Sequence, residues 1–136
     1  MNDDDILILD CGSLFTKYGI SSKSKSSDPL LLPSSFKNGQ LEYPTEILPS
    51  KTDSFYNKKE FSFPLRKGEV NEQKLYFKLI EQIINNYVSQ SSISNIFMTE
   101  QEISLRRERE ILTEILFEHF DFKNVFLARK AACAIY

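Results

Sequence analysis

Near its N-terminus the chain reads ILILDCGSLFTKYGI over residues 6–20. The apolar run at residues 6–9 predicts a buried strand, and the cluster DCGS at residues 10–13 predicts a tight turn. Residues 14–20 follow with strand-favouring side chains such as Phe15 and Tyr18. We therefore expect two strands joined in a hairpin around Gly12.

After this hairpin the extended pattern continues briefly and then stops. Residues 21–27 are rich in serine and lysine, which indicates a solvated loop, and three leucines at residues 30–32 predict a third strand that ends at Pro33. From residue 34 to residue 66, prolines and scattered aromatic side chains give no sustained period. We expect this stretch to be an irregular excursion that is either packed on the domain edge or mobile.

The second half of the chain alternates helical and extended patterns. Residues 72–90, after an expected N-cap at Asn71, and residues 104–120 place apolar side chains at three-to-four spacing, which predicts two amphipathic helices. Short apolar runs at residues 95–99 and 124–128 predict strands, and residues 129–136 open a third helix. The expected apolar stripes are Tyr76, Leu79, Ile80, Ile83, Ile84 and Tyr87 in the first helix and Leu105, Leu112, Ile115, Leu116 and Phe120 in the second.

The resulting element order is β-β-β-α-β-α-β-α. Strands that are joined by short turns pair antiparallel, whereas strands that are joined through a helix pair parallel. The sequence therefore predicts an α/β fold with a mixed five-stranded sheet, antiparallel in its first part and parallel in its second.

Composition limits the classes of function. A chain of 136 residues with 41% hydrophobic content can form one domain with a real core. The net charge of -2 gives no electrostatic reason for nucleic-acid binding. The longest apolar run, residues 29–33, is far too short to cross a bilayer. We expect no direct contact with nucleic acid or membrane.

The cysteines and the histidine give no sign of a metal site. Cys11 and Cys133 lie far apart and His119 is the only histidine, so the spacing typical of zinc ligands is missing. We predict no metal site, two reduced thiols in an intracellular compartment, and a packed position for both cysteines. The acidic start at residues 3–5 is also unlike the basic start of a signal peptide.

The second predicted helix carries most of the remaining charged candidates. Arg106, Arg107 and Arg109 alternate with Glu108 and Glu110, so we expect a face that is directed toward water, with a partner-binding patch as the alternative. His119 falls on the polar side near the C-terminal end of this helix, where a cation is mildly favourable. A solvent or capping role is expected for it, not a catalytic one.

Several segments, in order, resemble actins and actin-related proteins. The resemblance begins with LDCGSLFTKYG at residues 9–19 and continues through PLRKGEV at 64–70, FMTE at 97–100, RERE at 107–110, LFEHF at 116–120, VFLA at 125–128 and AACAIY at 131–136. It implies an actin-like (ribonuclease H-like) fold that is present only in part. Residues 1–33 would form the first hairpin and third strand, residues 34–66 a shortened insertion in place of subdomain 2, and residues 67–136 the half that alternates helices and strands, all within one partial domain.

The resemblance also makes the predicted turn the first phosphate loop of an actin. Backbone N–H groups in such a turn suit phosphate oxygens, with Gly12 allowing close approach and Ser13 adding a hydroxyl. Lys17 would place a charge near the phosphates, and Asp10 would hold a hydrated Mg²⁺. The alternative interpretation is an ordinary hairpin turn with a solvated Lys17.

Three departures from the actin pattern indicate that this loop is vestigial. Leu14 stands in place of the second glycine and crowds the expected phosphate position. Lys130 stands where actins have the glutamine that orients the attacking water, and an ammonium group has no acceptor for that task. The second phosphate loop would lie beyond residue 136. We predict no catalytic residues and no cofactor, with binding of ATP and Mg²⁺ expected only if a second half is supplied.

These observations lead to a binding role with two alternatives. The chain is expected to be a divergent, truncated actin-related protein that acts as a non-catalytic cytoskeletal or complex subunit, with actin or actin-related subunits as partners in the cytoplasm. Within the family, FTK at residues 15–17 and the short insertion look most like the pointed-end actin-related protein of dynactin. The alternatives are a nuclear actin-related subunit of a chromatin-remodelling complex, or a fragment of a longer ATPase of the actin, heat-shock chaperone and sugar-kinase class.

Overall fold

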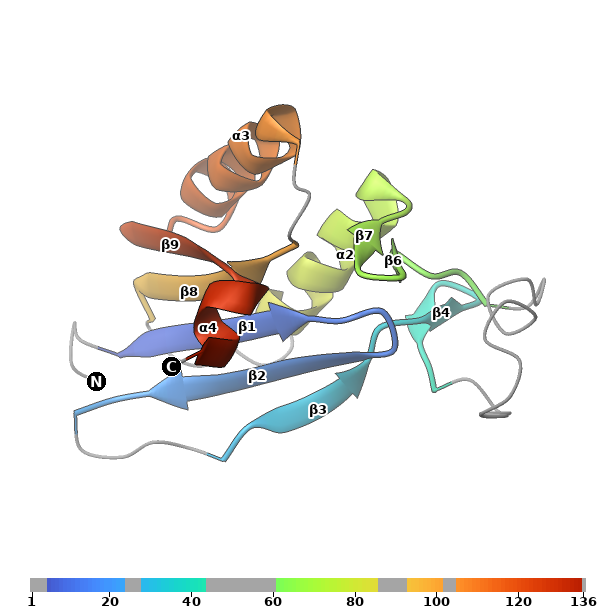
Figure 1. Ribbon diagram of the computed structural model, residues 1–136, viewed down its shortest axis with the longest axis horizontal. Coiled ribbons are helices and arrows are strands. Elements are labelled where there is room, and N and C mark those ends of the chain that lie inside the picture. Colours follow the sequence, from blue (N-terminus) through green and yellow to red (C-terminus); the bar gives the residue numbers. More distant parts are fainter. Residues whose placement is uncertain (1–4, 24–27, 44–60, 86–92, 102–104, 136) are drawn as a thin grey trace.

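A mixed five-stranded sheet forms the centre of the molecule (Figure 1). The computed structural model describes residues 5–23, 28–43, 61–85, 93–101 and 105–135. The strands of the sheet are β1 (Ile6–Cys11), β2 (Phe15–Ser21), β3 (Leu30–Pro33), β8 (Asn95–Glu100) and β9 (Asn124–Arg129), in the order β3-β2-β1-β8-β9. The pairs β1–β2 and β2–β3 are antiparallel, and the pairs β1–β8 and β8–β9 are parallel. This confirms the predicted α/β fold with its mixed sheet.

Within the described residues, three helical segments accompany the sheet. They are α2 (Gln73–Ile83), α3 (Arg106–Glu114), which continues into a wider π-helical turn η2 (Ile115–His119), and α4 (Lys130–Ile135). Figure 1 shows α4 crossing in front of β1 and β8, whereas α2 and α3 lie toward the other side of the sheet. None of the described helices is long and apolar enough to pass through a membrane.

The core lies between the sheet and the helices α2 and α3. Leu7 and Leu9 on β1 are fully buried, and the register places them beside Ile96 and Met98 of β8. The helices contribute Leu79, Ile80, Ile83, Leu112 and Leu116 to the same cluster. The apolar positions of each helix fall on one stripe because they recur every three to four residues, which matches the helical period.

In the part of the chain that the structure describes, two small hairpins follow the third strand. They are formed by β4 (Phe36–Lys37) with β5 (Gln40–Leu41) and by β6 (Leu65–Arg66) with β7 (Glu69–Val70). The two residues that turn each hairpin, Asn38-Gly39 and Lys67-Gly68, all have positive φ angles between 51° and 81°, as a type I′ turn requires. The pair Asn38-Gly39 is a standard hairpin signal, although no strand was predicted in this region.

The described part of the insertion at residues 34–66 is packed. This favours an excursion packed on the domain edge over a mobile one. Phe36, Phe61, Phe63 and Leu65 are buried, and the backbones of Phe36 and Ser62 are joined by two hydrogen bonds of 2.9 and 2.8 Å. Residues 44–60 lie outside the described residues, so the sequence expectation for them stays a prediction.

Some details of the predicted helices are wrong. The N-cap of α2 is Glu72 and not Asn71. The Asn71 side chain donates a hydrogen bond to the carbonyl of Phe63 at 3.2 Å, so it is engaged outside the helix. Leu105, expected in the apolar stripe, precedes α3 and is 64% exposed. Tyr87 lies outside the described residues.

Candidate functional site: the turn between β1 and β2

The residues of the predicted phosphate loop lie where the carboxyl ends of three parallel strands meet. Asp10 is near the end of β1, Thr99 is near the end of β8, and Lys130 directly follows β9. This edge is where open α/β sheets usually bind ligands, because the strands release their loops there. The sheet register therefore brings together side chains that are about 90 to 120 positions apart in the chain.

The carboxylate of Asp10 already has two partners within the chain. The Thr99 hydroxyl donates a hydrogen bond to Oδ1 at 2.5 Å, and the ammonium nitrogen of Lys130 lies 3.2 Å from the same oxygen. Lys130 also donates a hydrogen bond to the carbonyl of Cys11. One ammonium group thus joins the carboxylate and the backbone at the end of β1.

These contacts are reflected in the acidity of Asp10. Burial tends to raise the pKa of its carboxyl group, but the Thr99 hydrogen bond and the Lys130 charge act in the opposite direction and outweigh burial, with a smaller contribution from Lys17. The pKa of Asp10 therefore lies below its ordinary value of 3.8, and the carboxylate is charged at neutral pH.

Cys11 faces the core directly beneath this pair. Its side chain is fully buried, which confirms the packed position expected for it. Burial raises the pKa of its thiol to about 12 despite the nearby Lys130 charge. Its carbonyl accepts a second hydrogen bond, from the Gln101 amide at 3.1 Å.

The turn itself is closed by its own hydrogen bonds. The Gly12 N–H donates to the Phe15 carbonyl at 3.0 Å, and a Cβ atom at Gly12 would lie only 2.6 Å from that oxygen, so only glycine fits there. The Ser13 hydroxyl oxygen accepts a hydrogen bond from the Gly68 N–H at 3.0 Å. The Leu14 side chain is half-buried, and its carbonyl accepts from the Ser34 N–H at 2.9 Å.

Lys17 lies opposite Asp10 in the strand register and is exposed. Both residues line a hollow of about 340 Å³ that extends along β1 and β2 toward Gly19 and Pro29. The structure thus places all five residues in one hairpin, with Asp10 on β1, Lys17 on β2, and Gly12, Ser13 and Leu14 in the turn between the strands.

Sequence reasoning missed three contacts at this site. Thr99 and Gln101 were not singled out, although Thr99 lies near the end of β8 and Gln101 directly follows it. This strand runs parallel to β1, and such strand ends commonly carry functional side chains. Lys130 was noted only because it stands where actins have the glutamine that orients the attacking water. Its contact with Asp10 was not predicted.

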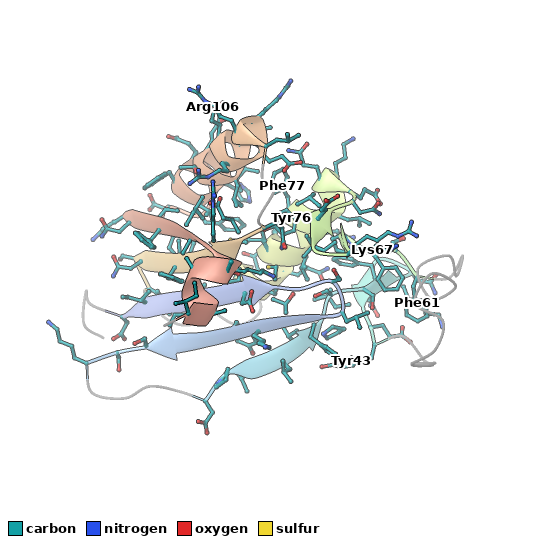
Figure 2. All side chains as sticks on the ribbon, in the orientation of Figure 1. Tyr43, Phe61, Lys67, Tyr76, Phe77 and Arg106 are labelled. Carbon is teal, nitrogen blue, oxygen red and sulfur yellow. The ribbon has the colours of Figure 1, made fainter. Side chains whose placement is uncertain are left out.

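Arg109 behaves differently from its neighbours on α3. Arg106 forms an exposed i,i+4 ion pair with Glu110 at 2.8 Å, and it points away from the sheet (Figure 2), as expected for a helix face directed toward water. Arg109 was expected on the same face, but its Nε lies 2.8 Å from a carboxylate oxygen of the buried Glu100. A buried carboxylate needs a nearby cation to offset its desolvation, so Arg109 has a structural role.

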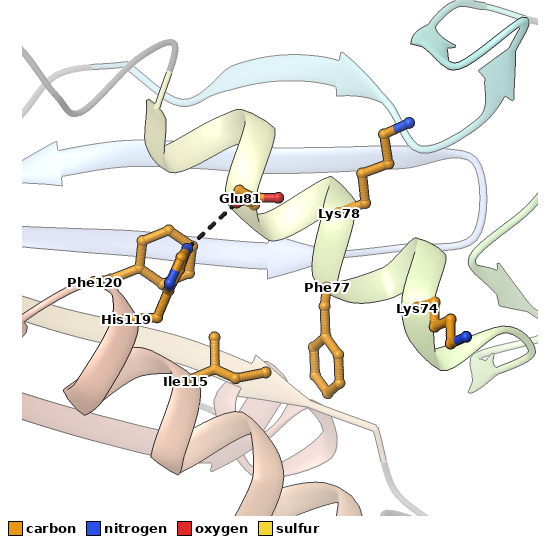
Figure 3. A pocket seen from close by; sticks show the side chains of 7 residues that line it. All are labelled: Lys74, Phe77, Lys78, Glu81, Ile115, His119 and Phe120. Carbon is orange, nitrogen blue, oxygen red and sulfur yellow. Dashed lines mark hydrogen bonds and ion pairs between the residues drawn. The ribbon is translucent and has the colours of Figure 1, made fainter.

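A second hollow of about 530 Å³ separates α2 from η2 (Figure 3). Phe77 and Ile115 line it, and at one end His119 contacts Glu81 at 3.3 Å. The Lys78 ammonium is directed away from the groove and lies 5.4 Å from the centre of the Phe36 ring. This groove lies between two helical segments and is lined partly by apolar side chains. His119 is exposed, as expected for its solvent-side position.

Cys133 is exposed on α4, so the packed position predicted for it is wrong. The small side chains of this helix do not form a buried stripe, because every α4 residue from Ala131 to Ile135 is exposed. Within the described part of the chain, no three His, Cys, Asp or Glu side chains come together in a way that could hold a metal ion.

The fold and the turn define a protein of the actin class. The actin family model matches residues 1–136, the whole chain. This chain therefore belongs to the actin family, and the resemblance found in its sequence segments is confirmed at that level.

Proposed function

We propose that this chain is a divergent actin-related protein that acts as a non-catalytic subunit of a larger protein complex. The contact between the Lys130 ammonium and the Asp10 carboxylate carries the proposal. Nucleotide hydrolysis in this turn would need Asp10 available for a hydrated cation and an acceptor near the attacking water. Lys130 engages the first group and, as a donor only, does not supply the second.

The other residues of the turn support the same conclusion. The Ser13 oxygen and the Gly12 N–H are both used in contacts within the protein, so a phosphate would have to compete with them. Leu14 adds a bulky side chain where glycine would leave room. Phosphoryl transfer relies on several positioned groups acting together, so a turn in which more than one of them is engaged or replaced is poorly suited to it.

The test is isothermal titration of the 136-residue chain with Mg-ATP, together with a phosphate-release assay. We expect no binding in the micromolar range and no release above background. A variant with Lys130→Gln and Leu14→Gly carries the residues that the resemblance implies for actins at these two positions, and it serves as the comparison. Micromolar affinity of the unaltered chain for Mg-ATP would contradict the proposal.

A binding role is supported by the sheet face opposite α2 and α3. Ile8 is 40% exposed and Phe126 is 61% exposed on this face, and the Phe97 and Phe126 rings stack at 5.3 Å. Apolar surface of this kind marks contacts with other protein surfaces. The proposed partners are actin or actin-related subunits in the cytoplasmic cytoskeleton, in an arrangement similar to the pointed end of dynactin.

Two alternatives use the same observation. A nuclear actin-related subunit of a chromatin-remodelling complex would bury this face on other partners, and a longer actin-fold ATPase would bury it on its own remaining chain. Affinity purification followed by mass spectrometry separates them. Recovery of dynactin subunits supports the proposed role, recovery of remodelling subunits supports the nuclear one, and co-purification of a longer product of the same gene supports the third.

A further inference from the structure

The Lys130 ammonium lies against the Asp10 carboxylate, the group that the resemblance to actins implies would hold a hydrated divalent cation. Its nitrogen lies 3.2 Å from Oδ1 of Asp10 and donates a hydrogen bond to the Cys11 carbonyl. Both partners are oxygens, one charged and one neutral, which are the ligand types that hard cations select. The Thr99 hydroxyl donates to the same Oδ1 atom at 2.5 Å, so it occupies further space on that side of the carboxylate.

A magnesium ion does not fit this arrangement as it stands. Mg²⁺ binds oxygen ligands at about 2.0–2.1 Å with near-octahedral geometry and keeps several waters. An ion at that distance from Oδ1 would have to displace the Lys130 ammonium or lie close to it, and two positive charges at such a separation repel each other strongly. The residues present therefore favour the ammonium group over the ion.

We infer that Lys130 acts as a tethered counter-ion that replaces the divalent cation of an actin-type turn and makes this turn independent of metal. The inference rests on the proposed function in one respect, because it assumes that the turn between β1 and β2 derives from a nucleotide-binding loop. It goes further by assigning Lys130 a positive role in holding the end of β1 to the start of α4.

The sheet explains why a tethered ammonium can do this. Lys130 directly follows β9, and the register pairs Glu100 with Arg129, so the backbone of residue 129 is fixed one position before the lysine. A group held in this way is always near its partner, whereas a dissolved ion must reach a sufficient concentration first. Asp10 and Lys130 side chains are only about one-third exposed, at 35% and 30%, so water screens the pair incompletely.

A cation titration without nucleotide tests this inference. The unaltered chain, K130Q and K130R are heated in EDTA and in millimolar MgCl₂ or CaCl₂, and Tb³⁺ luminescence is titrated in parallel. Arg129→Gln is the matched control, because it removes the same charge from the neighbouring exposed side chain. We expect the unaltered chain, K130R and R129Q to melt at the same temperature with and without divalent cations.

K130Q should behave differently in both measurements. It should melt several degrees lower in EDTA, regain part of the loss in CaCl₂, and bind Tb³⁺ at least ten-fold more tightly than the unaltered chain. A cation response in the unaltered chain equal to that of K130Q would overturn the inference, and so would a K130Q variant that folds and shows no response. If K130Q does not fold, the unaltered chain decides alone, since saturable Tb³⁺ binding overturns the inference and its absence supports it.

The two proposals fail in different ways. Binding of ATP by the unaltered chain in EDTA contradicts the proposed function and leaves the role of Lys130 standing. Binding of ATP only when Mg²⁺ is present contradicts both.

Discussion

The two faces of the five-stranded sheet have similar apolar strands but different surroundings. On one face, Leu7 and Leu9 are completely buried under α2 and α3. On the other, Ile6 and Ile8 of the same strand are 37% and 40% exposed, although α4 crosses that side (Figure 1). A strand with apolar residues at every position is typical of a sheet that is covered on both faces. The difference indicates which surface this chain uses for its own stability and which surface is left for the proposed protein contact.

At Asp10, the exposed face of the sheet carries a charge in place of apolar side chains. Asp10 lies on the same side of β1 as Ile8, since side chains alternate along a strand. Its charge is balanced by Lys130 at the start of α4. The short helix thus covers the polar end of this face, and the apolar end with Phe97 and Phe126 stays accessible.

The largest expected contrast concerns the two cysteines, one on each side. A thiol pKa of about 12 instead of 9.0 lowers the thiolate fraction of Cys11 at neutral pH roughly a thousand-fold, and burial also blocks access. Cys133 is exposed on α4. Timed alkylation with mass spectrometry should therefore modify Cys133 within minutes and Cys11 only in denaturant. Two thiols that react equally fast in the folded chain would contradict the assignment of the faces.

The next contrast is in the free energy of unfolding. Leu9→Ala should lower it by about 3 kcal/mol, because the substitution leaves a cavity in a packed core. Ile8→Ala on the same strand should lower it by about 1 kcal/mol or less, because much of the side chain already contacts water. Urea denaturation of both variants gives the comparison directly. Equal losses would mean that the face carrying Ile8 is covered in solution, for example by self-association.

A smaller effect is expected at acid pH. The pKa of Asp10 is lowered in the folded chain, so its contribution to stability is complete above pH 3.8 and is lost as the pH falls through the folded value. Asp10→Asn should lower stability at neutral pH by about 1 kcal/mol or less, because the pair is partly exposed. The difference from the unaltered chain should shrink toward pH 3 in acid-denaturation curves. Asp121→Asn, at an exposed turn, is the control.

The smallest effect on stability is expected from the exposed face itself. Phe126→Ser should change the free energy of unfolding by only about 0.5 kcal/mol, yet it should reduce binding of a hydrophobic dye and any self-association seen by light scattering. Leu105→Ser is the matched control, because its exposure of 64% is close to the 61% of Phe126 but it precedes α3. If both variants reduce dye binding equally, the face around Phe126 has no special role.

Much of the fold could be predicted because local patterns specify it. The run at residues 6–9, the turn at Gly12 and the two apolar helix stripes gave the correct element types in the correct order. The small hairpins were missed because strands of two residues carry no period of their own, although Asn38-Gly39 is a turn signal that could have revealed the first. Cys133 was misplaced because a run of small residues indicates a helix without indicating which side is buried.

The five residues proposed for the turn were found from sequence because they are consecutive or nearly so. Their partners Thr99, Gln101 and Lys130 come from strand ends that are distant in the chain, and their contacts depend on the parallel pairing of β1, β8 and β9. The ion pair between Arg109 and Glu100 was missed for the same reason, since it joins a helix to a strand end across the core edge.

The sequence by itself therefore determined the element order, the membership of the actin family and the location of the turn between β1 and β2. These properties follow from short-range periodicity and from residues that are adjacent in the chain. Only the tertiary structure decided that the Lys130 ammonium reaches Asp10 and that one face of the sheet is covered more fully than the other. Both depend on sheet register, which sets distances between residues that no local pattern connects.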